Sequence, residues 1–95
     1  MIIVTATITA KKDKVDEVLS RLKEVKAATI KEEGYHEYRI HQLAENPTQI
    51  LFYERWESLE HLEMHGKSEH FTKFADLTDI LLDKTFDIKI YNEVL

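Results

Sequence analysis

The segment Tyr35–Trp56, YHEYRIHQLAENPTQILFYERW, decides the fold because it holds two strand-like runs on either side of one turn. The turn is predicted at AENPT, since Asn-Pro favours one. In the first run, alternate positions form two sets: Tyr35, Glu37, Arg39 and His41, then His36, Tyr38, Ile40 and Gln42. In the second run, QILFYERW, the two sets are Phe52, Glu54 and Trp56, then Leu51, Tyr53 and Arg55. The segment therefore predicts a β-hairpin, and the mixed faces of its first strand indicate a cavity or an interface.

The residues before the hairpin predict one strand and one helix. The N-terminal run MIIVTATIT is rich in β-formers, and its apolar set should pack under helices: Ile2, Val4, Ala6 and Ile8. Apolar residues at helical spacing then predict a helix over about residues 12–33. Asp13 is its expected N-cap, and Gly34 is its expected C-terminal stop.

The residues after the hairpin predict two short helices and a last strand. Ser58 is the expected N-cap of a helix that ends at Gly66, and Ser68 is the expected N-cap of the next one. The final run TFDIKIYNEVL alternates as a strand. The order β-α-β-β-α-β, with the second helix broken in two, predicts an α+β fold of the ferredoxin-like split βαβ type. We expect a four-stranded antiparallel sheet and one domain over residues 1–95.

Composition excludes several classes of function. The chain has 95 residues and a formal net charge of −5, without the basic stripe that nucleic-acid binding requires. It has no cysteine, which excludes disulfides and thiolate chemistry. No apolar run approaches the roughly 20 residues of a membrane span, so we expect no membrane insertion. The N-terminus does not resemble a signal peptide, and a cytoplasmic location is the default expectation.

The sheet face away from the helices predicts a homodimer. A sheet covered on one side leaves the other side open, and Ile3, Thr5 and Thr7 fall on that side together with one set of hairpin residues. A mixed aromatic and aliphatic face of this kind marks an interaction site. We therefore expect two copies to associate through these faces.

The histidines of the segment 53–71, YERWESLEHLEMHGKSEHF, raise the question of a metal site. His61 and His65 lie one helical turn apart, which suits two ligands of one ion. The zinc-protease motif needs Glu directly after the first His, and Leu62 stands there instead. A third ligand, His70 or Glu69, lies beyond Gly66. We therefore expect no metal, and a polar helix face is the alternative for these histidines.

Acid–base chemistry is the second hypothesis for the same segment. His65 directly precedes the Gly66 break, where its side chain can turn toward the sheet and exchange a proton with a phenol or enol. A capping histidine near a helix end is the structural alternative. Glu54, on an inward strand face, must be paired or its pKa rises. Trp56 is expected to close the end of the core, and Tyr38 to lie at a cavity or at the core edge.

Three motifs in this chain resemble the antibiotic biosynthesis monooxygenase (ABM) family. They are the E-x-G-x-x-x-Y pattern in KEEGYHEYRIHQ, the strand end FYERWES, and the helical segment LEHLEMHGKSEHFTKF. The chain is most similar to the small quinol monooxygenases of that family. The resemblance implies a dimeric α/β barrel and oxidation of a small aromatic or quinone-like ligand by O₂ without metal, flavin or haem. It implies His65 as the acid–base residue, with Tyr38, Glu54, Trp56 and His70 as substrate-binding or supporting residues.

The same residues bear on other functions found in families of this resemblance. Haem-degrading members have an Asn on the first strand and a haem-ligating His on the last helix, and both are lacking here. A second branch isomerises a small phosphorylated carbonyl signal, for which Lys67 or Arg39 would supply a cation. A non-catalytic ligand-binding or regulatory dimer is the third alternative, because one fold hosts many functions.

Overall fold

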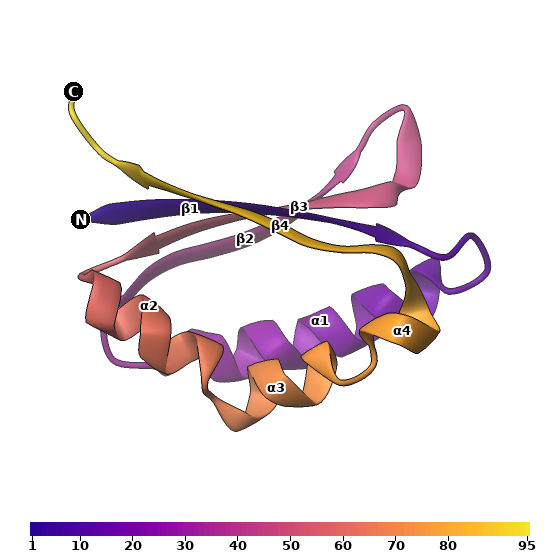
Figure 1. The fold of residues 1–95 in the computed structure, drawn as a ribbon, viewed down its shortest axis with the longest axis horizontal. Coiled ribbons are helices and arrows are strands. Elements are labelled where there is room, and N and C mark those ends of the chain that lie inside the picture. Colours follow the sequence, from indigo (N-terminus) through magenta and orange to yellow (C-terminus); the bar gives the residue numbers. More distant parts are fainter.

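A computed structural model describes residues 1–95 and shows one sheet with every helix on the same side of it (Figure 1). The elements, in chain order, are β1 Ile2–Ala10, α1 Val15–Thr29, β2 Tyr35–Leu43, β3 Asn46–Trp56, α2 Leu59–Gly66, α3 Glu69–Ala75, α4 Thr78–Leu81 and β4 Leu82–Asn92. The predicted ferredoxin-like α+β fold is thereby confirmed. None of the helices is long and apolar enough to cross a membrane.

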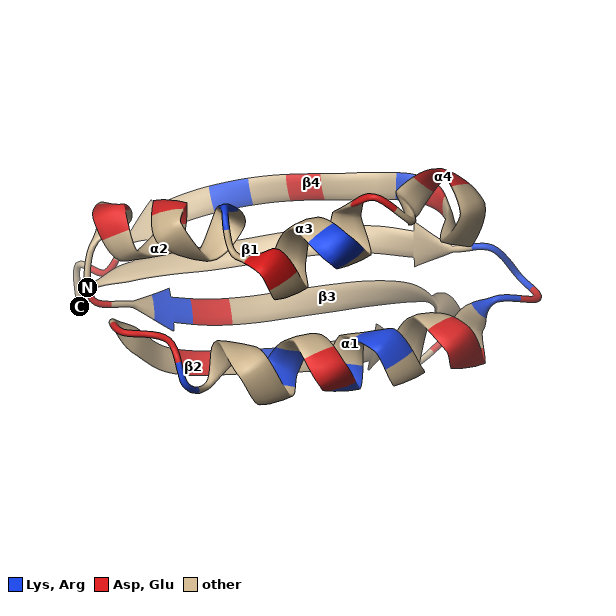
Figure 2. Cartoon of the chain, turned by 90° about the horizontal axis from the view of Figure 1, so that it is seen from below, with Lys and Arg blue, Asp and Glu red and all other residues tan.

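The sheet is antiparallel throughout and has the strand order β2-β3-β1-β4. β1 lies in the interior of the sheet, and its inward residues Val4, Ala6 and Ile8 are buried as predicted. α1 runs beside α3 across the helix-covered face, and charged residues lie on the outward turns of the helices (Figure 2). The helix layer and this sheet face enclose the core.

The hairpin is tighter than predicted at its turn and irregular at its start. The turn occupies Ala44 and Glu45, and β3 already begins at Asn46. Pro47 is tolerated because it lies within a register shift, where no ladder hydrogen bond needs its missing N–H. A second shift between Tyr35 and Glu37 turns Tyr35 toward Trp56, whose ring it meets edge-on at 6.5 Å. Our prediction that Tyr35 shares a face with Glu37 is therefore wrong.

The first helix is shorter than predicted at both ends. Its N-cap is Lys14 rather than Asp13, and no side chain caps it. It ends at Thr29, so Gly34 is not its stop. Gly34 instead has φ +84° in the turn that leads into β2, a conformation that favours glycine. The early end places Glu32 in a turn that faces α2.

The later helices follow their predicted caps. The hydroxyl of Ser58 accepts the His61 amide at the start of α2, and the hydroxyl of Ser68 accepts the Phe71 amide at the start of α3. The region breaks into three helices rather than two, because a further interruption separates α3 from α4. The new cap at Ser68 resets the helix direction directly after His65, which positions the candidate site.

Candidate functional site

His65 lies in the last turn of α2 with its side chain turned toward the sheet. The residue is 3% exposed. The centre of its ring lies 4.9 Å from that of Trp56 and 5.4 Å from that of Tyr38. The structure thus brings His65 to the part of the sheet that was expected from the sequence.

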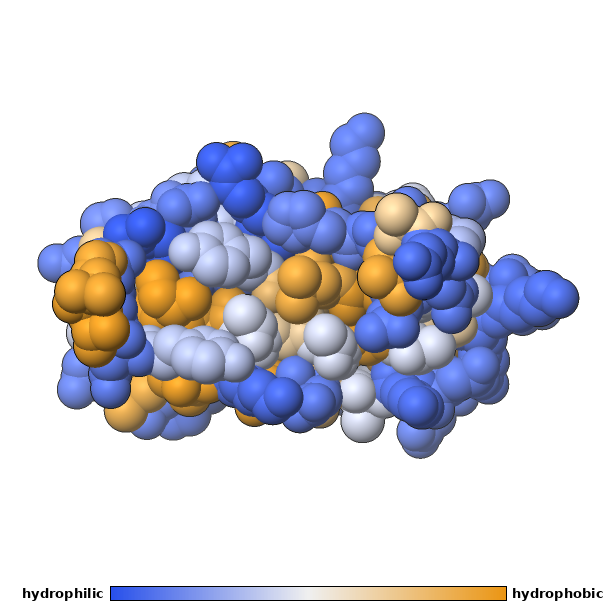
Figure 3. All heavy atoms as spheres, turned by 90° about the horizontal axis from the view of Figure 1, so that it is seen from above, coloured by the Kyte–Doolittle hydropathy of each residue, from blue (hydrophilic) through white to orange (hydrophobic).

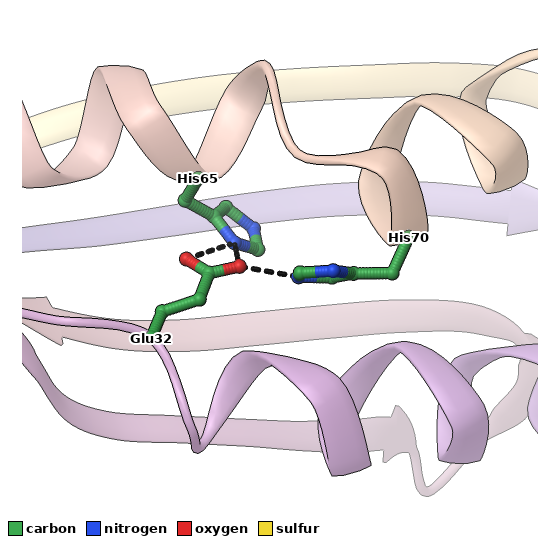
Figure 4. A group of neighbouring side chains, drawn as sticks. All are labelled: Glu32, His65 and His70. Atoms are coloured by element: carbon green, nitrogen blue, oxygen red, sulfur yellow. Dashed lines mark hydrogen bonds and ion pairs between the residues drawn. The ribbon is translucent and has the colours of Figure 1, made fainter.

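The Glu32 carboxylate holds one side of the His65 ring. Its two oxygens lie 3.0 Å and 3.2 Å from Nδ1 of His65, and it also pairs with Nε2 of His70 (Figure 4). Because an ionised carboxylate only accepts hydrogen bonds, Nδ1 carries the His65 proton in this contact. In the neutral ring, Nε2 is then left as the acceptor.

Nε2 of His65 is the one buried side-chain nitrogen or oxygen in the structure without a hydrogen-bond partner. Buried polar atoms are almost always paired, so an orphan of this kind requires an explanation. His65 lines a cavity between the sheet, α2 and α3. A ligand in that cavity would supply the missing partner.

The cavity is small and largely apolar. Its volume is about 240 Å³. An apolar cavity of roughly 150 Å³ already accommodates benzene. Its apolar walls include Phe52, Leu62, Phe71, Phe86, Ile88 and Ile90. The polar side chains that line it are those of Tyr38, Glu54 and His65, and no Lys or Arg lines it. This lining suits a neutral aromatic ring that carries hydroxyl groups.

Glu54 is a buried carboxyl group on the cavity wall. It is 5% exposed, and its Oε1 accepts a hydrogen bond of 2.9 Å from Nε1 of Trp56. Burial raises the pKa of Glu54 to about 7, with a smaller upward contribution from the charge of Glu32 and a downward one from the Trp56 hydrogen bond. Glu54 therefore exists in both protonation states near neutral pH.

Burial also sets the charge states of the other two polar wall residues. It raises the pKa of Tyr38 above its usual range, with Glu54 and Glu32 adding to the effect, so Tyr38 stays a phenol. It lowers the pKa of His65, although the hydrogen bond and charge of Glu32 oppose the shift. A neutral His65 can accept a proton.

The other predicted site residues stand behind the cavity rather than on its wall. Trp56 is fully buried beneath His65, where it holds Glu54. His70 lines a separate groove on the outside and reaches inward only as far as Glu32. His61, one turn before His65, lies 2.7 Å from the Ser58 hydroxyl through Nδ1 and does not join the cluster.

One group of side chains has the spacing of a metal site. Ligand atoms of Glu32, His65 and His70 lie within 4.8 Å of one another. Hydrogen bonds already join the carboxylate to each histidine, and we interpret the group as a hydrogen-bonded network. The absence of a metal remains a prediction.

Glu32 is the residue that sequence reasoning missed. It lies 33 positions from its partner His65 and in a turn, so no periodic pattern connects the two. The E-x-G-x-x-x-Y pattern does contain it, because this pattern begins at Glu32 and continues through Gly34 to Tyr38. That pattern was the available signal.

The chain is thus an α+β protein of split βαβ topology with a histidine–carboxylate pair behind an apolar cavity. A family model described as antibiotic biosynthesis monooxygenase matches residues 1–77, and the chain therefore belongs to that family. No curated protein matches it significantly.

Solved structures share the whole fold. A conserved protein from Methanosarcina mazei Go1 is 34% identical, with a TM-score of 0.91 over 98% of this chain and 92% of that one. PA3566 from Pseudomonas aeruginosa is 26% identical, with a TM-score of 0.91 over 99% and 94%. A structure described as an antibiotic biosynthesis monooxygenase is 24% identical, with a TM-score of 0.93 over 100% of both chains, and shows the shared fold.

Proposed function

We propose that this protein is a cofactor-independent monooxygenase that oxidises a small quinol or phenol with O₂. The observation that carries the proposal is Nε2 of His65, an unpartnered acceptor on the wall of an apolar cavity of ring size. Membership of the antibiotic biosynthesis monooxygenase family supports it.

His65 is the proposed base. A quinol seated in the cavity gives its O–H proton to Nε2, and the Glu32 carboxylate at Nδ1 stabilises the imidazolium that forms. Tyr38 and protonated Glu54 offer hydrogen bonds to the quinol oxygens. The electron-rich anion then reduces O₂, so that one oxygen atom enters the ring and the other leaves as water. Overall, one quinol and one O₂ give one hydroxyquinone and one water.

The lining of the cavity argues against the phosphorylated-carbonyl alternative. A phosphate requires cationic partners, and neither Lys67 nor Arg39 lines the cavity. Arg39 pairs with Glu37 at 2.8 Å instead. A non-catalytic ligand-binding dimer uses the same cavity and is separated by the turnover assay below.

A homodimer is part of the proposal. The sheet face away from the helices shows apolar and weakly polar residues along its middle and hydrophilic residues around its rim (Figure 3). Its centre contains Ile3, Thr5, Leu51 and Tyr53. Two such faces would bury one another. Sedimentation at micromolar concentration should give a dimer, and a single species of 11.2 kDa would contradict it.

Oxygen consumption tests the activity. Wild-type protein with a menadiol-like quinol should consume O₂ faster than uncatalysed autoxidation, and the product should be a hydroxyquinone. Binding of the quinol without added oxygen consumption would favour the non-catalytic dimer. We also expect a colourless protein without stoichiometric metal, which absorption spectra and elemental analysis would check.

A further inference from the structure

The cluster of Glu32, His65 and His70 crosses the helix layer and ends at two different hollows. His65 lines the inner cavity. His70 lines an outer groove of about 300 Å³ between α1 and α3. Glu32 contacts both histidines (Figure 4). It lines neither of the two hollows.

Exposure to solvent increases along the cluster from the inside to the outside. The exposed fraction of the side chain is 4% for His65, 17% for Glu32 and 23% for His70. The inner end therefore faces the cavity, whereas the outer end is more accessible to water. The groove beside His70 is polar on both sides, with Arg21 and Glu24 from α1 and Glu69 and Lys73 from α3.

A single carboxylate between two imidazoles can balance one positive charge. The Glu32 carboxylate accepts one hydrogen bond from Nδ1 of His65 and another from Nε2 of His70. Two imidazolium rings on either side of it would repel one another across a poorly solvated space. The electrostatic free energy of the cluster is therefore lowest when one histidine is charged and the other is neutral.

We propose that Glu32 couples the two histidines, so that a proton taken up by His65 in the cavity releases a proton from His70 into the outer groove. The proposal rests on the proposed role of His65 as the base. In the proposed exchange, the positive charge moves from the His70 ring to the His65 ring as the ligand loses its proton.

The proton count balances at named atoms. The ligand O–H bond breaks and a new N–H bond forms at Nε2 of His65. The N–H bond at Nδ1 of His70 breaks, and its proton goes to water in the groove. The N–H groups at Nδ1 of His65 and Nε2 of His70 stay intact and remain hydrogen-bonded to Glu32 throughout. The ligand gains one negative charge, the solvent gains one proton, and the cluster keeps its charge. The reverse exchange returns the proton when water forms.

Proton release on ligand binding tests the coupling without any oxidation. The probe is 4-nitrophenol, whose anion absorbs visible light, mixed anaerobically with protein in mildly acidic, weakly buffered solution that contains a pH indicator. Wild-type protein should release about one proton per phenolate formed. His70→Gln keeps an N–H donor for Glu32 but cannot release a proton, so release should fall to about zero while phenolate still forms.

Two further variants make the result specific. His41→Gln removes an exposed histidine on β2 and should leave the proton count unchanged. Glu32→Gln removes the counter-charge of His65 and should weaken phenolate formation itself. If His70 had only a structural role, His70→Gln would change thermal stability but not the number of protons released per phenolate.

Several outcomes would overturn the coupling. They are proton release by His70→Gln at the wild-type level, retention of the proton by wild-type protein, and failure of wild-type protein to form phenolate. The oxidation is tested apart from this, because the probe needs no O₂. Coupled proton release without quinol oxidation would sink the monooxygenase proposal and leave the coupling standing.

Discussion

The inward residues of β3 divide the helix-covered sheet face into a dry half and a site half. From one end to the other they are Ile50, Phe52, Glu54 and Trp56, all buried. Ile50 lies in register between Ile8 of β1 and Gln42 of β2, and both isoleucines belong to the apolar core. Around Glu54 the neighbours are Tyr38, His65 and the cavity. The same strand therefore contributes to an apolar core at one end and, at the other, to a cavity whose apolar wall carries three polar side chains.

The difference shows where stability is gained and where it is given up. Burial of an aliphatic side chain contributes about 1.5–3 kcal/mol, so the dry half stabilises the fold. Burial of a carboxyl group costs free energy unless the group stays protonated or is well paired. Glu54 has one indole partner and a raised pKa, and His65 has an unpaired nitrogen. Such costs are typical of sites whose groups are kept ready for a ligand.

The largest expected effect is the loss of turnover in His65→Ala. Removal of a general base typically lowers the rate by about 10² to 10⁴. The protein should remain folded, since the dry half of the core is untouched. His61→Ala, one turn earlier on the same helix, should keep its turnover because His61 contacts Ser58 rather than the cavity. Steady-state oxygen consumption would check both, and equal behaviour of the two variants would make His65 a structural residue.

The converse variant is Ile50→Ala in the dry half. Ile50 is fully buried, and truncation of such a residue to Ala costs about 2–5 kcal/mol. Urea denaturation should show this loss of unfolding free energy. The folded fraction should turn over quinol at the wild-type rate, because Ile50 does not line the cavity. A selective rate loss without destabilisation would break the distinction between the two halves.

Glu54→Gln should change how stability depends on pH. In the wild type the folded-state pKa of Glu54 lies at about 7, above its ordinary value of 4.5. The folded protein therefore binds more protons than the unfolded chain between these values, and stability falls as pH rises. The full difference is about 3 kcal/mol, present below pH 4.5 and lost above about pH 7.

The glutamine variant lacks this ionisation and keeps an acceptor for Nε1 of Trp56. As the pH rises from 4.5 to 8, the unfolding free energy of the variant should increase by about 3 kcal/mol relative to that of the wild type. The lowered pKa of His65 acts in the opposite direction, but both proteins share it. Urea unfolding curves across this pH range would measure the difference, and parallel curves would show that Glu54 does not titrate as a buried acid.

Local patterns predicted most of the fold because each feature depended on neighbours in sequence. The alternation of β1, the caps at Ser58 and Ser68 and the inward set of β3 are of this kind. The end of α1 was placed too late because Gly34 was interpreted as a helix stop. Its positive φ serves the entry to β2 instead, where an added Cβ would lie 2.3 Å from Cγ of His61.

The site could be predicted only in part, for the same reason. Tyr38, Glu54 and Trp56 follow from strand alternation, and His65 lies at the predicted end of α2, directly before Gly66. The contact between Glu32 and His65 depends on where the turn after α1 meets α2 in space, which no local pattern encodes. His70 faces the outer groove because the new cap at Ser68 starts α3 in a different direction, so helical spacing does not relate it to His65.

The smallest expected effect is that of Gly66→Ala, at the boundary of the site half. Gly66 lines the cavity and is itself exposed, and an added Cβ would meet no atom within 4 Å. Its φ is not positive, so the backbone does not require glycine. Replacement by Ala in a helix should raise the unfolding free energy by at most about 0.5–1 kcal/mol. Leu62 lies on the same helix face one turn earlier and lines the cavity, so the new methyl group should narrow the cavity beside α2. The KM for a two-ring quinol should then rise more than the KM for a one-ring quinol.

Gly34→Ala is the matched control, because its positive φ and the contact with His61 make the same change destabilising. If Gly66→Ala also lost stability, the space beside Gly66 would be filled in solution, and the site half would be packed like the dry half.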